Sequence, residues 1–431
     1  MLRAPIHLQH NRARYTANRT TPCPSSAGVI VSDSSNSTNN DTESTELHLD
    51  DIEIEDLRKR VSEKWNTYPA DVLPAWVAEM DFPLASPIRK ILSTALDGDD
   101  LGYPIGLRAT GLPDVFSERM ENRYGWKTDS RMADVITDVV QGLYVSIEVL
   151  TEPGDGIIVQ TPIYPPFLNA VKDTKRRLVE NRLLNTDEGW RIDFDALRAS
   201  IDDRTRMILL CNPHNPTARV FTEAELTELG AIACEHDLVI VSDEVHGDLT
   251  FDGRKHIPIA TLSPEIAERT LTITSATKAF NIPGLRCAIA HFGSKRLQQA
   301  YHSIPRHIRG GVGLLGIYAT QAAWQQSQPW LDEVRAYLET NRNIVADFVA
   351  ERLPNIKHHK CEATYLAWLD CTEANLEGSP ASHILETQRL ALNEGRTFGA
   401  DFNQFTRLNF ATSKRILAEA LERIEKATQS T

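Results

Sequence analysis

The chain has 431 residues, of which 41% are hydrophobic and 24% are charged, and its formal net charge is −13. This length suits two or three domain-sized units with a core that needs no disulfide or metal. The negative charge argues against a nucleic acid or an anionic membrane as partner, and no apolar run approaches the roughly 18 residues of a membrane helix. The six cysteines form no C-x-x-C pair, so we expect no disulfide framework, no zinc site, and free thiols in the cytoplasm.

Residues 1–46 form a tail of low complexity. Ser, Thr and Asn make up more than half of residues 21–46, a composition that cannot bury enough apolar area to offset the entropy of ordering. We therefore expect the tail to be disordered and the globular part to begin near Leu47. Arginines without an acidic residue before Asp33 are a feature of transit peptides, but prolines interrupt this segment.

Short apolar segments alternate with helix-like segments between residues 134 and 291. Continuous apolar strands separated by helices are typical of a mostly parallel sheet that is covered on both faces. The predicted fold class is therefore α/β, with a large doubly wound domain at residues 96–327. Strands are predicted at Asp134–Asp138, Gly156–Gln160, Arg206–Cys211, Leu238–Ser242, Leu271–Ser275 and Cys287–His291, and helices from Leu143 and at Glu223–Glu235.

The last hundred residues change character and predict a smaller α+β domain at residues 328–431. Residues 47–95 are expected to pack with it. The predicted elements are a long helix at Gln328–Leu353, a strand at Thr364–Asp370, a helix at Ser382–Leu392, a strand at Thr406–Phe410 and a final helix from Ser413.

Polar motifs follow three of the predicted strands of the large domain. They are Asn212–Thr217, Asp243–His246 and Ser275–Lys278. Ligands of doubly wound sheets bind beyond the carboxyl ends of the strands. The three motifs are therefore expected to converge on one site.

Five motifs occur in an order that resembles one known superfamily. They are QGLY (Gln141–Tyr144), CNPHNPTAR (Cys211–Arg219), SDEVH (Ser242–His246), SATKAFNIPGLR (Ser275–Arg286) and RLNFA (Arg407–Ala411). Together they are similar to the class I/II aminotransferase superfamily, the fold type I enzymes that use pyridoxal 5'-phosphate (PLP). The resemblance extends over roughly residues 50–425. It implies an enzyme with PLP as cofactor and an amino acid as its small-molecule substrate.

The resemblance assigns roles around the cofactor ring. Lys278 matches the lysine whose amine binds PLP covalently. Asp243 matches the aspartate beside the pyridine nitrogen, where an anion keeps the ring protonated and electron-withdrawing. Asn215 and His246 match positions that contact the phenolic oxygen of PLP, and Tyr144 matches the aromatic residue that stacks on the ring.

A second group of residues is expected to hold the cofactor phosphate. The backbone N–H groups of Gly142 and Leu143 are predicted to open a helix, and a helix N-terminus binds anions. Ser275 and Thr277 offer hydroxyl groups. Arg286 resembles the phosphate-binding arginine of the superfamily, and its guanidinium suits phosphate through paired donors.

Two further residues concern the substrate and the assembly. Arg407 matches the arginine that binds the α-carboxylate of the substrate, and Tyr103 resembles the tyrosine that reaches the cofactor phosphate of the neighbouring subunit, which implies a homodimer. One residue departs from the superfamily pattern, because Ala218 stands where NPHNPTGR has glycine; a positive φ there would strain alanine slightly. Candidates for the wall that selects the substrate side chain are Tyr68, Trp76, Phe82 and Tyr164.

Within the superfamily the chain looks most like the cystathionine β-lyase branch of PatB/MalY type. The segments that carry this likeness are Tyr68–Phe82, Gly102–Pro104 and Thr364–Asp370, with the histidine of the DEVH motif. The branch implies a carbon–sulfur β-lyase that releases a thiol, pyruvate and ammonia from cystathionine or cysteine S-conjugates, with sulfur secondary metabolism as a setting.

Three other functions stay open on the sequence. The first is an aminotransferase for an aromatic or neutral amino acid. The second is an activity like that of aminocyclopropane-carboxylate synthases. The third is a PLP-binding regulatory protein that acts through a partner, although no helix-turn-helix segment is attached.

Overall fold

The computed structural model describes residues 47–429. The expectation of a disordered tail at residues 1–46 therefore lies outside the described residues. Within the part of the chain that is described, no helix is long and apolar enough to cross a membrane.

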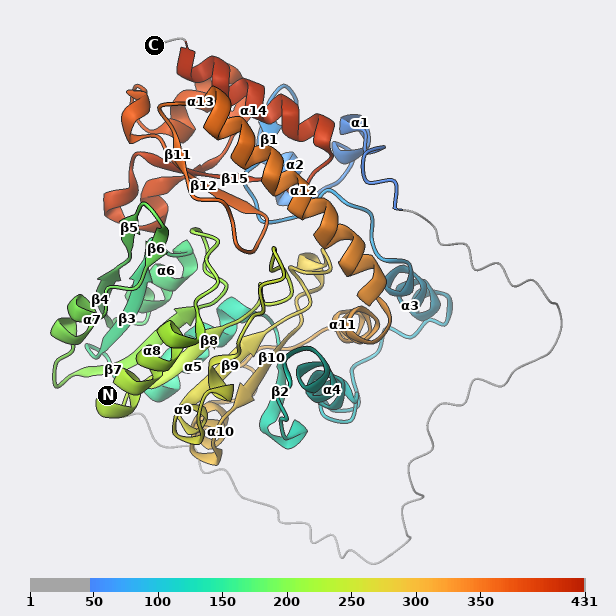
Figure 1. Cartoon of the computed structure of the whole chain (residues 1–431). Coiled ribbons are helices and arrows are strands. Elements are labelled where there is room, and N and C mark those ends of the chain that lie inside the picture. The colour runs from blue at the N-terminus through green and yellow to red at the C-terminus, as the bar shows by residue number, and fades with distance from the viewer. Residues whose placement is uncertain (1–46, 430–431) are drawn as a thin grey trace, which may run out of the picture. The chain divides into compact units, whose positions relative to one another are not determined.

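A seven-stranded sheet dominates the large half of the molecule (Figure 1). Its strand order is β2-β10-β9-β8-β7-β3-β4, and every neighbouring pair is parallel except the two that involve β10. The predicted α/β class with a mostly parallel sheet is therefore confirmed. The strands are β2 (Ala133–Ile136), β3 (Gly156–Thr161), β4 (Arg177–Arg182), β7 (Thr205–Cys211), β8 (Val239–Asp243), β9 (Thr270–Thr274) and β10 (Ala288–Phe292).

Both faces of this sheet are covered by helices. Successive side chains of a strand point to opposite faces, so neighbouring residues of one strand belong to different cores. Val159 belongs to the core on the side of α5 (Val139–Leu150) and α6 (Pro165–Asp173). Its neighbour Ile158 belongs to the other core, with α7 (Phe194–Ser200), α8 (Glu223–Glu235) and α9 (Pro264–Glu268). In Figure 1, α8 lies in front of the sheet and α5 behind it. Burial of both faces explains why the central strands are continuously apolar.

The sequence missed the edge strand β4, and the burial pattern gives the reason. Only two of its six residues are buried, since it pairs with β3 alone. A half-exposed strand with Arg177, Glu180 and Arg182 does not have the apolar run by which the central strands were recognised.

The smaller half is built on a four-stranded antiparallel sheet of order β11-β12-β15-β14. The predicted helix Ser382–Leu392 is shorter than expected, because Arg389 adopts a left-handed conformation (φ 55°) that ends it. The strands are β11 (Lys357–His358), β12 (Leu366–Asp370), β14 (Asn393–Glu394) and β15 (Phe405–Asn409), and the helices are α12 (Gln328–Arg352), α13 (Pro380–Gln388) and α14 (Lys414–Gln429).

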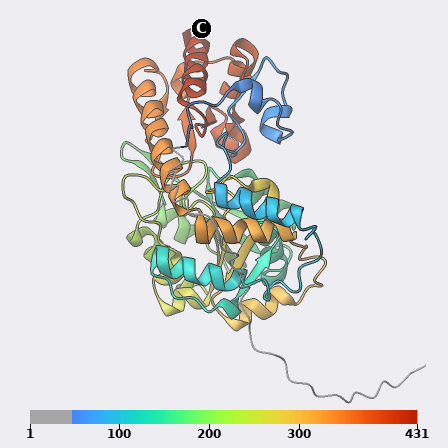
Figure 2. The ribbon, with the colours of Figure 1, turned by 90° about the vertical axis from the view of Figure 1, so that its right-hand side faces the viewer.

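The first described residues, 47–95, contact both halves of the molecule. The short strand β1 (Leu73–Pro74) pairs with β13 (Leu390–Ala391), so this part of residues 47–95 joins the smaller half. The following helix α3 (Ser86–Asp97) packs instead on α11 (Leu314–Gln326), as Figure 2 shows. Residues 75–82 therefore cross from one half to the other.

Ala218, where the superfamily pattern has glycine, has a positive φ of 58° and is buried. The expected strain is thus present at this residue. Its carbonyl accepts hydrogen bonds from the N–H groups of Glu362 and Ala363, both at 3.0 Å. The surrounding chain therefore holds the left-handed conformation in place.

Helix α8 offers a clean test of local stability. Thr222 caps it: its hydroxyl accepts a hydrogen bond from the Glu225 N–H while the Glu225 carboxylate accepts one from the Thr222 N–H. We expect Thr222→Ala to lower the free energy of unfolding by about 1 kcal/mol, because one helix N–H loses its acceptor. Thr222→Ser, which keeps the hydroxyl, is the control in urea denaturation. Equal stability of the two variants would contradict the capping role.

Candidate active site

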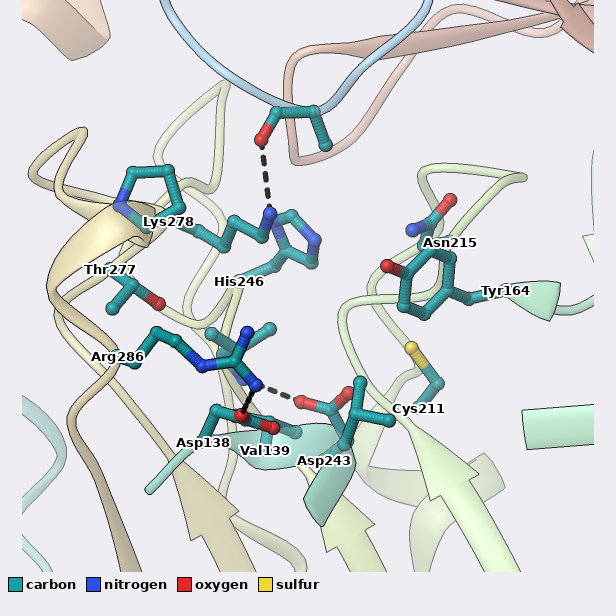
Figure 3. Close-up of a pocket in the computed structure, with 14 residues that line it drawn as sticks. Asp138, Val139, Tyr164, Cys211, Asn215, Asp243, His246, Thr277, Lys278 and Arg286 are labelled. Carbon is teal, nitrogen blue, oxygen red and sulfur yellow. Dashed lines mark hydrogen bonds and ion pairs between the residues drawn. The ribbon is translucent and has the colours of Figure 1, made fainter. Parts of the chain in front are cut away.

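A cavity of about 340 Å³ lies beyond the carboxyl ends of β7, β8 and β9 (Figure 3). It forms at this edge because the strands themselves are apolar and the polar motifs follow them in loops. Half of the twelve residues predicted for the site line this cavity. They are Asn215, Asp243, His246, Thr277, Lys278 and Arg286.

Lys278 enters the cavity from the turn that follows β9. Its amine donates a hydrogen bond to the carbonyl oxygen of Ala78 at 3.0 Å, which Figure 3 shows above the lysine. Burial lowers the pKa of Lys278 to about 8, and the cation of Arg407 adds to this effect. Roughly a tenth of this amine is therefore a free base at pH 7, far more than for an exposed lysine, and a nucleophile or a proton acceptor requires the free base.

Asp243 is the last residue of β8 and lies directly beside Cys211 of β7. Burial raises the pKa of Asp243 to about 7, although its Oδ1 accepts a hydrogen bond from the Val245 N–H at 3.0 Å. The cavity thus holds an amine with a lowered pKa and a carboxyl group with a raised one. Displaced pKa values in one cavity are typical of catalytic sites.

Arg407 on β15 reaches the cavity through Asn215. Its Nη1 donates to Asn215 Oδ1 at 2.8 Å, and its Nη2 donates to Asn393 Oδ1 at 2.5 Å and to the Trp76 carbonyl at 3.1 Å. The side chain is buried, and this burial lowers its pKa to about 10. Its Nε has no partner among the described residues. Arg407 is therefore a fixed buried cation with donor capacity to spare.

His246 lies near the amine of Lys278 and is buried. Burial lowers the pKa of His246 to about 3, and the cations of Lys278 and Arg407 contribute to this shift, so the imidazole is neutral. Its Nδ1 is buried without a partner in the described part of the chain. A buried polar atom left without a partner indicates room for a ligand atom.

The opposite end of the cavity is the N-terminus of α5. Asp138 caps this helix, since its Oδ1 accepts a hydrogen bond from the Gln141 N–H at 2.8 Å, and its Oδ2 pairs with Arg286. Val139 and Val140 are the first two helical residues and line the cavity. Backbone N–H groups at these two positions have no acceptor within the helix. With Arg286 and Thr277 they form an anion-binding corner.

The predicted roles of Gly142 and Leu143 are wrong on this geometry. The helix begins at Val139 and not at Leu143, so the Gly142 N–H already donates to the Asp138 carbonyl at 3.0 Å. Leu143 is fully buried in the core beneath the helix. Both residues lie one turn too late to offer free N–H groups to a phosphate.

Tyr144 also lies away from its predicted place at the cofactor ring. Its hydroxyl donates to Asp173 Oδ2 at 2.7 Å, and Tyr144 does not line the cavity. The aromatic residue at the cavity is Tyr164, whose N–H donates to the Asn215 carbonyl at 3.0 Å. Tyr164 was among the candidates for the substrate wall. Its place just after β3, before two prolines, was the sequence signal for a loop residue at this edge.

Ser275 and Tyr103, which were also predicted for the site, lie outside the cavity lining. Ser275 is buried behind Thr277, and its hydroxyl donates to the Cys287 carbonyl at 2.6 Å, so its single proton is already used. Tyr103 is 99% exposed and does not approach the cavity of its own chain. The residues of the cavity that sequence reasoning missed are Ala78, Asp138, Val139, Val140, Cys211, Val245 and Pro283.

Comparison with known proteins places the chain in a family. The model of the aminotransferase class I and II family matches residues 121–424, and the chain belongs to this family. A cystathionine β-lyase of Corynebacterium glutamicum is 36% identical, with 86% of this chain and 98% of the relative covered. The cystathionine β-lyase PatB of Bacillus subtilis is also 36% identical, with coverages of 83% and 92%. A solved PLP-bound C-S lyase of Staphylococcus hominis has a TM-score of 0.82 at 28% identity, with 88% of this chain and 98% of that chain covered.

The lowered pKa of Lys278 can be measured in the cofactor-free protein. Acetylation of its amine by acetic anhydride is expected to rise with a midpoint near pH 8, because burial favours the neutral form. The exposed Lys59 is the internal control, since a hydrogen bond to Asp56 raises its pKa. Mass spectrometry of the two peptides gives both midpoints. A common midpoint for Lys278 and Lys59 would contradict the assigned environment.

Proposed function

We propose that the chain is a PLP-dependent carbon–sulfur β-lyase that releases a thiol, pyruvate and ammonia from cystathionine or cysteine S-conjugates. The observation that carries the proposal is the pairing of Lys278, with its pKa lowered to about 8, and Asp243, with its pKa raised to about 7, in one cavity. Its relatives in Corynebacterium glutamicum and Bacillus subtilis are named for this reaction, and they are similar over most of the chain.

The lining of the cavity suits PLP in its polarity. Lys278 would hold the carbonyl carbon, and the buried carboxyl of Asp243 would face the pyridine nitrogen. The orphaned Nδ1 of His246 and the amide of Asn215 suit the phenolic oxygen, and Tyr164 offers an aromatic face. The phosphate would lie at the anion-binding corner of Val139, Val140, Thr277 and Arg286. When bound, PLP withdraws electrons from the Cα atom of the amino acid.

The side chains of this chain would then divide the reaction between them. Arg407 orients the α-carboxylate through its fork of donors, which Asn215 and Asn393 hold in place. Lys278 removes the Cα proton, since its lowered pKa makes the free amine available near neutral pH. The thiolate leaves from Cβ readily, because a free thiol has a pKa of only about 8.5.

Transamination is the second candidate function. The family model that matches residues 121–424 is that of class I and II aminotransferases, and proton removal by Lys278 serves both reactions. The two reactions differ in their later steps. β-Elimination consumes no second substrate, whereas transamination needs a 2-oxo acid to regenerate the cofactor.

The deciding experiment mixes the PLP-loaded protein with cystathionine or an S-substituted cysteine in the absence of any 2-oxo acid. We expect continuous release of pyruvate, and of thiol in equal amount. Lys278→Ala should lower the rate by roughly 10²–10⁴-fold or more, as loss of a general base does. Lys357→Ala is the control, because Lys357 is exposed and outside the lining of the cavity. Absence of pyruvate, with turnover restored by a 2-oxo acid, would make the protein an aminotransferase.

We further propose that the active unit is a homodimer in which Tyr103 reaches the cofactor phosphate of the partner. Tyr103 is 99% exposed, and the loop residues Leu101, Ile105 and Ile308 are also exposed, at 57%, 87% and 64%. Large apolar side chains exposed together are typical of interaction sites.

The unpaired thiols Cys211, Cys287, Cys361 and Cys371 are buried, which suits the proposed cytoplasmic location.

The dimer is tested by sedimentation velocity. We expect the unaltered protein to sediment as a dimer and Ile105→Asp combined with Ile308→Asp to sediment as a monomer, because both charges would be buried in the interface. Val61→Asp is the control, since Val61 is 94% exposed at another place on the chain. Tyr103→Phe should stay dimeric and bind PLP more weakly. A monomeric unaltered protein would contradict the proposal.

A further inference from the structure

Residues 75–82 form a strap without regular secondary structure that passes over Lys278, and Figure 3 shows it above the lysine. All eight of its carbonyl groups accept hydrogen bonds, seven of them from side chains. Backbone outside helices and sheets is rarely held this completely by side chains. The position of the strap is therefore specified residue by residue.

Two of these carbonyls hold the side chains that the proposed reaction uses. The Ala78 carbonyl accepts from Lys278 Nζ at 3.0 Å and also from the Tyr365 hydroxyl at 3.0 Å. The Trp76 carbonyl accepts from Arg407 Nη2 at 3.1 Å. Because these acceptors lie two residues apart on one segment, a shift of the strap would move the amine and the guanidinium together.

The far end of the strap is anchored away from the cavity by a buried ion pair. Lys64 Nζ lies 2.8 Å from Asp81 Oδ2, and the two side chains are only 2% and 1% exposed. Trp65 Nε1 donates to the other oxygen, Asp81 Oδ1, at 2.8 Å, and Lys64 also donates to the Glu79 carbonyl at 3.3 Å. Lys64, Trp65 and Asp81 all lie outside the lining of the cavity.

A purely stabilising role for this ion pair is a poor explanation. Removing two charges from water is costly, and well-packed apolar side chains in their place are often as stable. An ion pair does, however, fix one geometry, because each charge must stay beside the other. Here the fixed element is the strap that carries the two acceptors.

We propose that Lys64 and Asp81 are positioning residues for the reaction: their buried ion pair fixes the strap so that its carbonyls hold Lys278 and Arg407 in register. The expected effect of this ion pair on turnover rests on the proposed function. The placement of the two side chains does not depend on which PLP reaction the protein catalyses.

The test variant is Lys64→Met with Asp81→Asn, which removes both charges and leaves an oxygen for Trp65. Arg389→Gln is the matched control, because it breaks the exposed ion pair with Asp71 just before β1, at 2.8 Å. We expect the backbone amide of residue 81, which donates to the Ala411 carbonyl, to exchange hydrogen roughly tenfold faster in the cofactor-free double variant, since local opening exposes it. Amides of β8 should be unchanged.

The loaded protein gives the second readout. The concentration of S-substituted cysteine that produces half of the cofactor absorbance change is expected to rise roughly tenfold in the double variant and to stay constant in the control, as loss of substrate orientation predicts. A lyase and an aminotransferase both give this absorbance change. Absence of pyruvate would therefore overturn the proposed function without touching the role of the strap.

Asn281→Asp is a second variant in case the double variant does not fold. Asn281 clamps the same strap by accepting from the Met80 N–H at 3.0 Å and donating to the Met80 and Phe82 carbonyls at 3.0 and 3.2 Å. Aspartate keeps the acceptor and loses the donors. We therefore expect faster hydrogen exchange at the amide of residue 81 and a higher half-saturating concentration of S-substituted cysteine. A folded variant of either kind with the exchange and half-saturation of the unaltered protein would overturn the proposal.

Discussion

The constraint on which the site depends is the burial of a lysine amine beside a carboxyl group and a guanidinium. Burial lowers the pKa of Lys278 and of Arg407 and raises that of Asp243, so burial disfavours the charged form of each group, although Arg407 stays a cation near neutral pH. Three such groups can lie buried close to one another only if fixed partners compensate them. The Ala78 carbonyl, the Val245 N–H and the oxygens of Asn215 and Asn393 provide this compensation.

The fold supplies these partners because its central sheet is apolar on both faces. Ile158 and Val159, adjacent on β3, lie in two different cores, which leaves little room for polar side chains inside the strands. The polar residues of the site are therefore confined to the strand ends and the loops beyond them. For the same reason the sequence predicted the fold class and the common site of Lys278, Asp243 and Asn215. An apolar strand followed by a polar motif is a strong pattern.

The residues expected to bind the cofactor phosphate were predicted wrongly because the start of one helix, α5, was placed too late. Val139 and Val140 are β-branched and follow an apolar strand, so the sequence favoured a helix that begins only near Leu143. Asp138 is the residue that decides otherwise, since its carboxylate caps the helix at the Gln141 N–H. The error of one turn placed the expected phosphate site at Gly142 and Leu143, whereas the proposed site lies at Val139 and Val140. The resemblance separately indicated Tyr144 as the aromatic residue of the cavity, where the structure has Tyr164. The strap could not be predicted from the sequence, because its partners Asn281 and Asn409 are about two hundred and more than three hundred residues away and its geometry depends on them together with Lys64.

The choice between elimination and transamination is not made by the residues that the sequence identified most readily. Lys278, Asp243 and Arg407 suit the binding and activation of any α-amino acid, and activation at Cα is common to both reactions. The outcome depends on whether Cβ carries a good leaving group that stays aligned while the amine of Lys278 acts. Alignment of this kind depends on the strap and its anchors together. Lys278 and Arg407 both donate hydrogen bonds to carbonyls of the strap, and a buried ion pair outside the cavity holds the strap. Selectivity for the reaction is therefore expected to lie as much in the rigidity of this frame as in the side chains that touch the substrate.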